Sequence, residues 1–423
     1  MLQVNLLRQH TDWVKERLAV KNFKQPELVD TIVALDDERK KLQGEFDLIQ
    51  SKINSSSKDI GELMKKGQRA LADAAKAEVS VLKNALEPLK TKMEEIETDL
   101  QFNLVQLPNL PAKEVPVGKT PEDNVVVRQG GTVPVLAGNA VPHWELTKKY
   151  NLIDFELGTK ITGSGFPLYI NKGAKLQRSL IQYFLDFNTA EGYTEYIPPF
   201  VVNEASAYGT GQLPDKEGQM YFVGEDKFYL IPTSEVPMTN IYRDTILKEE
   251  ELPIKMTAYS PCFRREAGSY GKDVRGLNRL HQFEKVEIIQ IVHPEKSHEV
   301  LDEMVLHVEK LLQSLQLPYR ILRLCGGDMG FTSAITYDFE VFSAAQQRWL
   351  EVSSVSNFES YQANRLKCRF KNGDNKTQLV HTLNGSSLAL PRILASLLEN
   401  NQGAEGIQVP QVLQRYFGAA FIQ

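Results

Sequence analysis

The sequence predicts an α+β protein of two parts: an N-terminal antiparallel α-helical coiled-coil hairpin, then a domain built on an antiparallel β-sheet flanked by helices. Three observations lead to this prediction. The N-terminal quarter carries a heptad repeat, a proline-rich segment follows it, and β-branched and aromatic runs then alternate with helical segments without a regular βα period. A chain of 423 residues also exceeds what one hydrophobic core usually serves, so domains are expected at 1–106 and 107–423.

The first expected element is the hairpin. Apolar residues recur at steps of three and four over residues 28–63 and again over 75–100, as they do in coiled coils. The turn-like sequence KKGQ at 65–68 joins the two runs, so the two helices are expected to run antiparallel. Pro88 lies inside the second run, where it is expected to kink the helix or to remove one of its hydrogen bonds.

Basic residues gather at the end of the predicted hairpin. Between residues 52 and 76, six lysines and arginines outnumber three aspartates and glutamates. A coiled coil is more often a structural or dimerisation element than an RNA-binding arm, but this local excess of positive charge favours contact with phosphates. The residues expected to contact nucleic acid there are Lys58, Lys65, Lys66 and Arg69.

The overall charge and the cysteines narrow the function classes. A net charge of -5 excludes a globally basic nucleic-acid binder and leaves room only for a local basic patch. Cys262, Cys325 and Cys368 lie far apart without CxxC spacing, which argues against a disulfide framework and a zinc site, so no zinc is predicted. The N-terminus lacks the pattern of an export signal, and no apolar run approaches the roughly 18 residues of a membrane span. A cytoplasmic protein outside the membrane is expected.

Charged residues are concentrated in the sequence FRREAGSYGKDVRGLNRLHQFEKVE, whose end reads as a buried strand. Arg264 and Glu266 are two apart, and Arg279, Phe283 and Glu287 are four apart, so each set is expected to lie on one face of a strand. Guanidinium groups bind phosphates, an aromatic ring stacks on a base, and carboxylates bind an ammonium group. The pattern therefore suits a nucleotide beside an amine-bearing ligand, with a solvated face of salt bridges as the alternative.

This stretch, residues 263–287, resembles motif 2 of the class II aminoacyl-tRNA synthetases. GYTEYIPPFV resembles the end of motif 1, placed near 174–202 with its proline at Pro199, and NGSSLALPRILASLL resembles motif 3 at 384–398, with its arginine at Arg392. Together with IPTSEVPMTN, LEVSSVSN and the hairpin, these motifs resemble those of the seryl-tRNA synthetases of the common bacterial type. The resemblance covers essentially the whole chain and implies a class II catalytic domain and a homodimer formed through motif 1.

The resemblance implies ATP-dependent attachment of L-serine to tRNA(Ser) through a seryl-adenylate, with Mg²⁺ as cofactor and tRNA(Sec) as a second candidate tRNA. Two alternatives stay open. One is a ligase of the same fold that loads an amino acid onto a carrier protein, and the long basic-tipped arm argues against it. The other is a non-catalytic RNA-binding paralogue, and the intact charged residues of motifs 2 and 3 argue against that one.

The resemblance also implies roles for individual residues. The implied catalytic residues are Arg264, Glu266 and Arg392. The implied serine contacts are Thr233, Ser234, Glu235, Arg264, Glu287, Asn384 and Ser386. The implied ATP contacts are Arg264, Arg265, Glu266, Arg279, Phe283, Glu351, Val352, Ser353, Ser354 and Arg392. Magnesium is expected on Glu351 and Ser354, and the tRNA is expected to contact Lys272 and Arg275 in addition to the hairpin residues.

Overall fold

A computed structural model of the chain describes residues 1–266 and 275–423. Lys272 lies outside the described residues. Contacts between residues divide the chain into two compact units, Met1–Ala19 with Phe23–Pro108 and Val20–Asn22 with Asn109–Gln423. Among the described residues, no helix is both long enough and apolar enough to cross a membrane.

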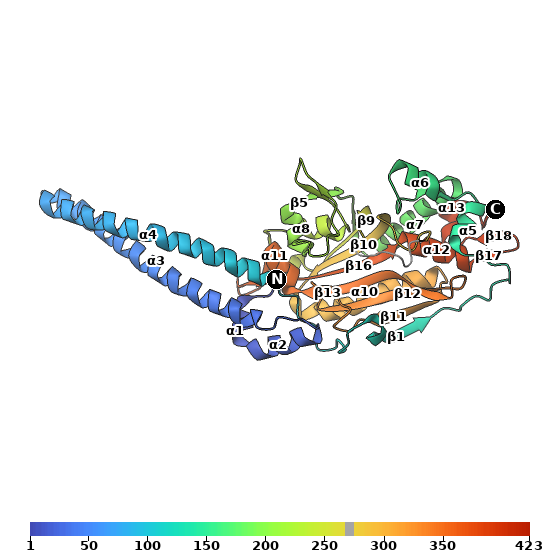
Figure 1. Cartoon of the computed structure of the whole chain (residues 1–423), viewed down its shortest axis with the longest axis horizontal. Coiled ribbons are helices and arrows are strands. Elements are labelled where there is room, and N and C mark those ends of the chain that lie inside the picture. Colours follow the sequence, from blue (N-terminus) through green and yellow to red (C-terminus); the bar gives the residue numbers. More distant parts are fainter. Residues whose placement is uncertain (267–274) are drawn as a thin grey trace. The chain divides into compact units, whose positions relative to one another are not determined.

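The first unit is dominated by a pair of long helices. The chain enters through α1 (Val4–Gln9) and α2 (Thr11–Val20), and the pair itself is α3 (Leu28–Lys65) and α4 (Arg69–Leu104). The two long helices run side by side, joined by a short turn after Lys65 (Figure 1). This confirms the predicted hairpin. Pro88 lies inside α4, which continues past it, so the proline does not end the helix.

A buried carboxylate lies among the covered residues of α3. Asp36 is 2% exposed and contacts three cations, Arg8 Nη2 at 2.5 Å, Arg39 Nη2 at 2.7 Å and Lys40 Nζ at 2.8 Å. Burial opposes the ionisation of Asp36, but hydrogen bonds from Lys40, Arg39 and Arg8 outweigh it and lower its pKa to about 2. Because Arg8 belongs to α1, the ion pair ties α1 to the long helix.

The second unit is built on a mixed sheet. Within the described residues this sheet has eight strands, in the spatial order β1 (Val125–Gly130), β11 (Tyr319–Arg323), β12 (Ile335–Ser343), β13 (Arg348–Glu359), β16 (His381–Ala389), β10 (Gln282–Val292), β9 (Ile254–Phe263) and β4 (Thr194–Tyr196). The neighbouring strands pair antiparallel, as predicted, except at the edge, where β4 pairs parallel with β9. A parallel pair requires a long crossover connection, and the chain between these two strands supplies one.

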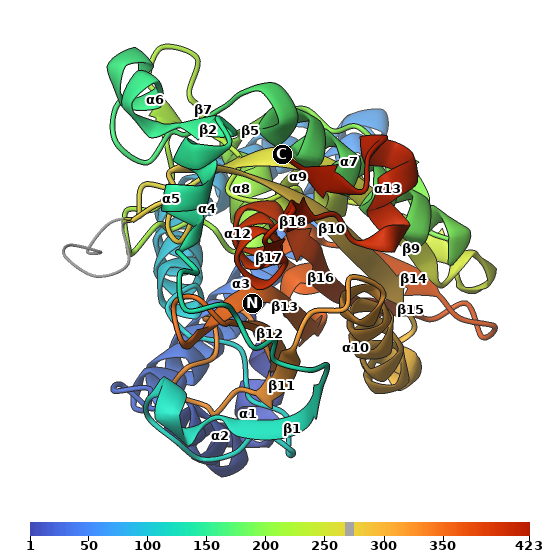
Figure 2. The same ribbon diagram turned by 90° about the vertical axis from the view of Figure 1, so that its right-hand side faces the viewer.

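Helices cover the sheet. The three that contribute most to its core are α7 (Asn171–Ala190), α10 (Ser297–Ser314) and α12 (Leu390–Asn400), which lie against the central strands (Figure 2). The other helices of this unit are α5 (His143–Lys149), α6 (Phe155–Ile161), α8 (Glu204–Thr210), α9 (Glu235–Asn240), α11 (Ser360–Leu366) and α13 (Gln411–Phe417), with 3-10 turns η1 (Pro121–Asp123), η2 (Glu249–Glu251) and η3 (Pro294–Lys296). The α+β class predicted from the sequence is confirmed.

Short strands form small sheets around this core. They are β2 (Ile153–Asp154) with β3 (Leu168–Tyr169); β5 (Val201–Asn203), β7 (Phe228–Leu230) and β6 (Phe222–Val223); β8 (Ile246–Lys248), β14 (Arg369–Lys371) and β15 (Thr377–Leu379); and β17 (Gln402–Gly403), β18 (Gly406–Gln408) and β19 (Phe421–Ile422).

The charged residues of motif 2 are only partly on strands. Phe283 and Glu287 lie on β10, as predicted. Arg264, Glu266 and Arg279 do not lie on strands, because the last register pair joins Gln282 to Phe263 and the chain leaves the sheet beyond it. The backbone of Glu266 has a φ of 49°, which is not compatible with an extended strand.

We predict that Asp36→Asn destabilises the base of the hairpin by about 2 kcal/mol, because three cations lose the charged acceptor that they share. Hydrogen exchange of the full-length protein at neutral pH should then show faster exchange in α1 and in the first turns of α3. Asp37→Asn is the matched control, since Asp37 is exposed and pairs with Arg8 at the surface. Equal exchange in both variants would contradict the stabilising role of the buried carboxylate.

Candidate active site

A pocket of about 590 Å³ opens on one face of the large sheet. The period of two along β10 explains why it is charged. Phe283, Lys285 and Glu287 point into the pocket, whereas Val286 and Ile288 point into the apolar core formed with α7, α10 and α12. One strand therefore supplies both the floor of the site and part of the core beneath it.

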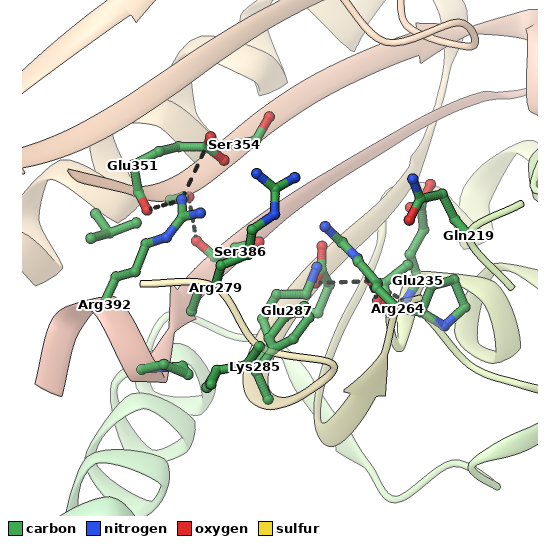
Figure 3. A pocket seen from close by; sticks show the side chains of 18 of the residues that line it. Gln219, Glu235, Arg264, Arg279, Lys285, Glu287, Glu351, Ser354, Ser386 and Arg392 are labelled. Atoms are coloured by element: carbon green, nitrogen blue, oxygen red, sulfur yellow. Dashed lines mark hydrogen bonds and ion pairs between the residues drawn. The ribbon is translucent and has the colours of Figure 1, made fainter. Parts of the chain in front are cut away.

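The structure brings most of the residues implied by the resemblance together in this pocket. Its lining includes Thr233, Glu235, Arg264, Glu266, Arg279, Phe283, Glu287, Glu351, Val352, Ser353, Ser354, Asn384, Ser386 and Arg392. Three further residues implied by the resemblance are outside the lining: Ser234 is buried, Arg265 is exposed, and Arg275 is exposed. In the view of Figure 3, Glu351, Ser354 and Arg392 lie at one end, and Gln219, Glu235 and Arg264 at the other.

The floor of the pocket holds a buried carboxylate with three side-chain partners. Glu287 is 1% exposed and forms an ion pair with Lys285. Its Oε2 also accepts a hydrogen bond from Thr233 Oγ1 at 3.2 Å, and its Oε1 accepts one from Asn384 Nδ2 at 3.0 Å. A carboxylate has about four acceptor positions, so these partners leave room for one more donor from the pocket.

A second carboxylate, Glu235, lies at the start of α9. Its Oε1 accepts a hydrogen bond from Gln362 Nε2 at 2.7 Å, and Thr382 Oγ1 in turn donates to Gln362 Oε1 at 2.7 Å. Burial raises the pKa of Glu235 to about 7, with the negative charge of Glu287 adding to the rise. A cationic ligand beside Glu235 would oppose this rise and favour its charged form.

The motif 2 arginines take up distinct positions. The guanidinium carbon of Arg264 lies 5.1 Å from the centre of the Phe283 ring, a cation–π contact, and its Nε donates to Pro232 O at 3.3 Å. Arg279 Nε pairs with Glu266 Oε2 at 2.5 Å, so the chain just after β9 is joined to the chain just before β10. The Arg264 guanidinium group and the Phe283 ring thus border one end of the pocket, and Arg279 lies between that end and Arg392 (Figure 3).

Arg392 and Glu351 form the opposite end of the pocket. Arg392 projects from α12, and its Nη1 donates to Glu351 O at 2.7 Å. Next to Glu351, Ser354 pairs in register with Asp338 of β12, whose Oδ1 is buried without a hydrogen-bond partner. Burial raises the pKa of Asp338 well above its usual range, and the negative charge of Glu351 raises it further. This end of the pocket therefore combines a cation with hard oxygen donors.

The sequence reasoning missed several residues of the site. Lys285, Gln219 and Asn278 line the pocket, and Gln362 holds Glu235 from α11. Lys285 was detectable, because it lies halfway between Phe283 and Glu287 and must share their face of the strand. The other three come from connections or from a distant helix, where no periodicity marks them.

The residues expected to contact tRNA lie elsewhere. Lys58, Lys65, Lys66 and Arg69 are all exposed around the turn that joins α3 to α4. Arg275 is exposed and lies over the Trp144 ring, with its guanidinium carbon 5.1 Å from the ring centre.

Within the described residues, no group of three or more His, Cys, Asp and Glu side chains is arranged to hold a metal ion.

Comparison with known proteins shows two family matches that together span most of the chain. The Seryl-tRNA synthetase N-terminal domain matches residues 1–111, and the tRNA synthetase class II core domain (G, H, P, S and T) matches residues 222–401. The chain is 49% identical over 424 residues to a Serine--tRNA ligase of Salinibacter ruber, covering 100% of this chain and 99% of the relative. It is 48% identical over 432 residues to a Serine--tRNA ligase of Delftia acidovorans, with 99% and 98% covered.

Solved structures agree with these matches. The seryl-tRNA synthetase from Pyrococcus horikoshii complexed with ATP is 33% identical with a TM-score of 0.91, and 99% of each chain is covered. The cytoplasmic Serine-tRNA ligase from Naegleria fowleri in complex with AMP is 28% identical with a TM-score of 0.87, covering 100% of this chain and 99% of the other. The chain therefore belongs to the seryl-tRNA synthetase family of class II aminoacyl-tRNA synthetases.

Proposed function

We propose that the protein attaches L-serine to tRNA(Ser) in two ATP-dependent steps, with tRNA(Sec) as a second candidate acceptor. The observation that carries the choice of amino acid is the buried Glu287 carboxylate, which retains one free acceptor position at the pocket floor. Thr233, Lys285 and Asn384 crowd this carboxylate, so the space beside it suits a small side chain. Family membership and the ATP bound by the Pyrococcus horikoshii relative support the use of ATP.

In this proposal Glu287 accepts the hydrogen bond of the serine hydroxyl. A site built around an acceptor discriminates strongly against an amino acid that lacks the hydroxyl, because the buried acceptor is then left with an unmet position. Glu235 binds the serine ammonium group, and Thr233, Asn384 and Ser386 complete the amino-acid site.

ATP occupies the rest of the pocket in this proposal. Phe283 stacks on adenine, and Arg264 binds the α-phosphate together with the serine carboxylate. Arg392 reaches the γ-phosphate, since its guanidinium group lies at the opposite end of the pocket from Arg264. Glu266 and Arg279, joined by their ion pair, also hold the nucleotide, with Val352 and Ser353 on β13.

Glu351 and Ser354 are the residues that would hold Mg²⁺. Their carboxylate and hydroxyl oxygens are the hard donors that this ion prefers, and a site of one or two carboxylates completed by phosphate oxygens is typical for it. Asp338, in register with Ser354 on the neighbouring strand, supports the assignment, because it brings a second carboxyl group to this end of the sheet. When bound, the ion neutralises charge on the phosphates.

The two reaction steps then depend on how the pocket places the reacting groups. An oxygen of the serine carboxylate attacks the α-phosphorus of ATP, the bond to pyrophosphate breaks, and seryl-adenylate forms. The terminal ribose hydroxyl of the tRNA next attacks the seryl carbonyl carbon, and AMP leaves with the electron pair. Arg264 neutralises the carboxylate and the phosphate so that they can approach, and aligning the two reactants supplies much of the rate.

We further infer a homodimer through motif 1. Exposed apolar side chains flank Pro199 in the described chain, with Ile197 86%, Phe200 38% and Val201 40% exposed, and pairing with a second copy would cover such side chains. Light scattering checks this inference, and a monomeric mass at micromolar concentration would contradict it. The expected cytoplasmic location stays a prediction.

The first experiment measures ATP–pyrophosphate exchange with each amino acid in turn, and then aminoacylation of tRNA(Ser). We expect exchange with serine, a loss of at least about tenfold with alanine or glycine, and transfer of serine to the tRNA. Exchange without transfer to any tRNA would favour the ligase that loads a carrier protein. Absence of exchange in a folded protein that still binds tRNA would favour the non-catalytic paralogue.

The raised pKa of Glu235 predicts a pH dependence. The carboxylate is ionised above pH about 7 and protonated below it, so binding of the serine ammonium group should weaken as the pH falls. We expect kcat/KM for serine to fall about tenfold from pH 8 to pH 6, a change that reports ionisation in the free enzyme. Glu235→Gln should have a low kcat/KM that is nearly constant over this range, and a profile identical to that of the wild-type protein would remove Glu235 from the ammonium site.

The basic end of the hairpin predicts a salt dependence. Changing Lys58, Lys65, Lys66 and Arg69 together to alanine should weaken tRNA binding and reduce the slope of log K against log salt by about 0.7 to 0.9 for each phosphate that is no longer neutralised. Serine-dependent exchange should not change. The matched control replaces four exposed lysines away from this end, Lys24, Lys41, Lys83 and Lys90. Equal slopes in both variants would indicate that the hairpin end does not bind tRNA.

A further inference from the structure

A histidine and a glutamate form a fully buried pair next to the active site. His143 of α5 and Glu399 of α12 are both 0% exposed, and His143 Nδ1 lies 2.6 Å from Glu399 Oε1. The backbone N–H of His143 donates to the same oxygen at 2.8 Å, and Ser343 Oγ donates to Oε2. Burial opposes ionisation, but the hydrogen bonds from His143 and Ser343 outweigh it and lower the pKa of Glu399. The pair therefore contains a carboxylate whose acceptors are already engaged.

The second ring nitrogen of His143 fixes its protonation. The backbone N–H of Leu277 lies 2.8 Å from His143 Nε2, and a backbone N–H can only donate. Nε2 must therefore be the unprotonated acceptor, and the ring proton lies on Nδ1, where it is donated to Glu399. His143 is a neutral imidazole held at both ends, which leaves its ring one orientation.

This histidine supports the end of motif 2 that leads into the pocket. Gly276 has a φ of +66°, and a Cβ at this position would come within 2.2 Å of His143 Nε2. The chain passes so close to the ring that only glycine fits. Asn278 is linked to the same buried pair through Gln346. Its Nδ2 donates to Gln346 Oε1 at 3.1 Å, and Gln346 Nε2 donates to Glu399 Oε1 at 2.9 Å.

The supported segment in turn holds Arg392. The carbonyl oxygen of Asn278 accepts a hydrogen bond from Arg392 Nε at 3.1 Å, while Arg392 Nη1 donates to Glu351 O at 2.7 Å. Two carbonyl oxygens thus set the direction of the guanidinium group, which extends toward Glu351 and Ser354 (Figure 3). One of the two is held in place by the segment that rests on His143.

We propose that His143, oriented by Glu399, is a positioning residue for the triphosphate site: it fixes residues 276–278 and through them the guanidinium group of Arg392. The proposal rests on the proposed use of ATP at Arg392. Neither His143 nor Glu399 lines the pocket, so neither touches a substrate. The network also accounts for a buried His–Glu pair that the chemistry of adenylation does not use.

Helix α5 also contacts Arg275, the residue that precedes Gly276. Trp144 and Glu145 follow His143 on α5, and both meet Arg275, through the ring contact and through an ion pair of 3.9 Å. Three consecutive residues of α5 therefore meet three consecutive residues of motif 2, from Arg275 to Leu277.

His143→Asn separates positioning from stability. An asparagine amide at the position of Nδ1 can still donate to Glu399, so the buried carboxylate keeps a partner, but the side chain is too short to accept from Leu277. Leaving a buried N–H unpaired costs enough to predict about a tenfold loss of kcat/KM for ATP in serine-dependent exchange. The KM for serine should stay within about twofold, because Glu235 and Glu287 are outside the network. His143→Gln, whose amide oxygen reaches the position of Nε2, should recover most of the loss.

A double-mutant cycle with Arg392→Ala identifies the route of the effect. If His143 acts through Arg392, then His143→Asn should lower kcat/KM for ATP less than about twofold when Arg392 is already alanine. Rates are divided by the fraction of active sites, measured by titration with adenylate formation, so that partial unfolding does not count as a catalytic defect. An equal loss in both backgrounds would overturn the proposal and leave the pair with a stabilising role alone.

Gly276→Ala tests the same contact from the other side. Its Cβ would press on His143 Nε2 and its backbone would be strained at a φ of +66°, so we expect the same ATP-specific loss per active site together with a lowered melting temperature. Unchanged ATP kinetics in this variant would also overturn the proposal. The proposed function fails separately, if the wild-type protein shows no serine-dependent exchange at all.

Discussion

The alternation of side chains along β10 is the constraint on which the second unit depends. Val286 and Ile288 complete the core beneath the sheet, and Lys285 and Glu287 form the floor of the pocket above it. A register slip of one residue would turn the ion pair into the apolar core and the aliphatic side chains into the pocket. Burying those charges without partners costs several kcal/mol, so the residues that make the site chemically useful also help to select the native register.

Structural features that depend on a short repeat of apolar and polar residues along the chain were predictable from the sequence. The hairpin followed from its heptads, and the pocket face of β10 followed from the spacing of Phe283 and Glu287. The sequence wrongly predicts strands at Arg264 and Arg279, because the alternation of residues continues past the last pair of hydrogen-bonded strand residues. No local feature of the sequence marks where that strand pairing ends. The parallel edge strand was not predictable either, since it depends on which strand the long crossover returns to.

Other parts of the site could not be predicted, because they join distant positions. His143 and Glu399 are separated by most of the second unit, and each alone reads as an ordinary residue of an amphipathic helix. Gln362 is likewise distant from Glu235, the carboxylate that it holds. Only the packing of α5, α11 and α12 brings these residues together, and no pattern within one element reports that packing.

Three buried carboxylates of the protein illustrate how partners decide what a charge can do. Asp36 is surrounded by cations, which lower its pKa and leave it a structural anchor. Glu399 is held by His143 and a hydroxyl group, which satisfy it with neutral donors. Glu287 has one cation, Lys285, and two neutral donors, which hold it in place and still leave it an acceptor position. The same chemical group is thus a structural anchor at Asp36, a satisfied acceptor at Glu399 and, in the proposed function, the acceptor for the serine hydroxyl at Glu287.

The distribution of buried residues along the hairpin has a mechanical consequence. In the half of the helix pair nearer its base the buried residues are Val29, Ile32, Asp36, Leu42, Ile96, Leu100 and Leu104, whereas the half toward the turn has Ile53, Ala72 and Val79. Local stability follows buried contact, so the two helices should separate more readily in the half toward the turn than at their base. The hairpin is thus stiffer where it begins than toward its far end, so the exposed side chains around the turn can shift while the base keeps its geometry.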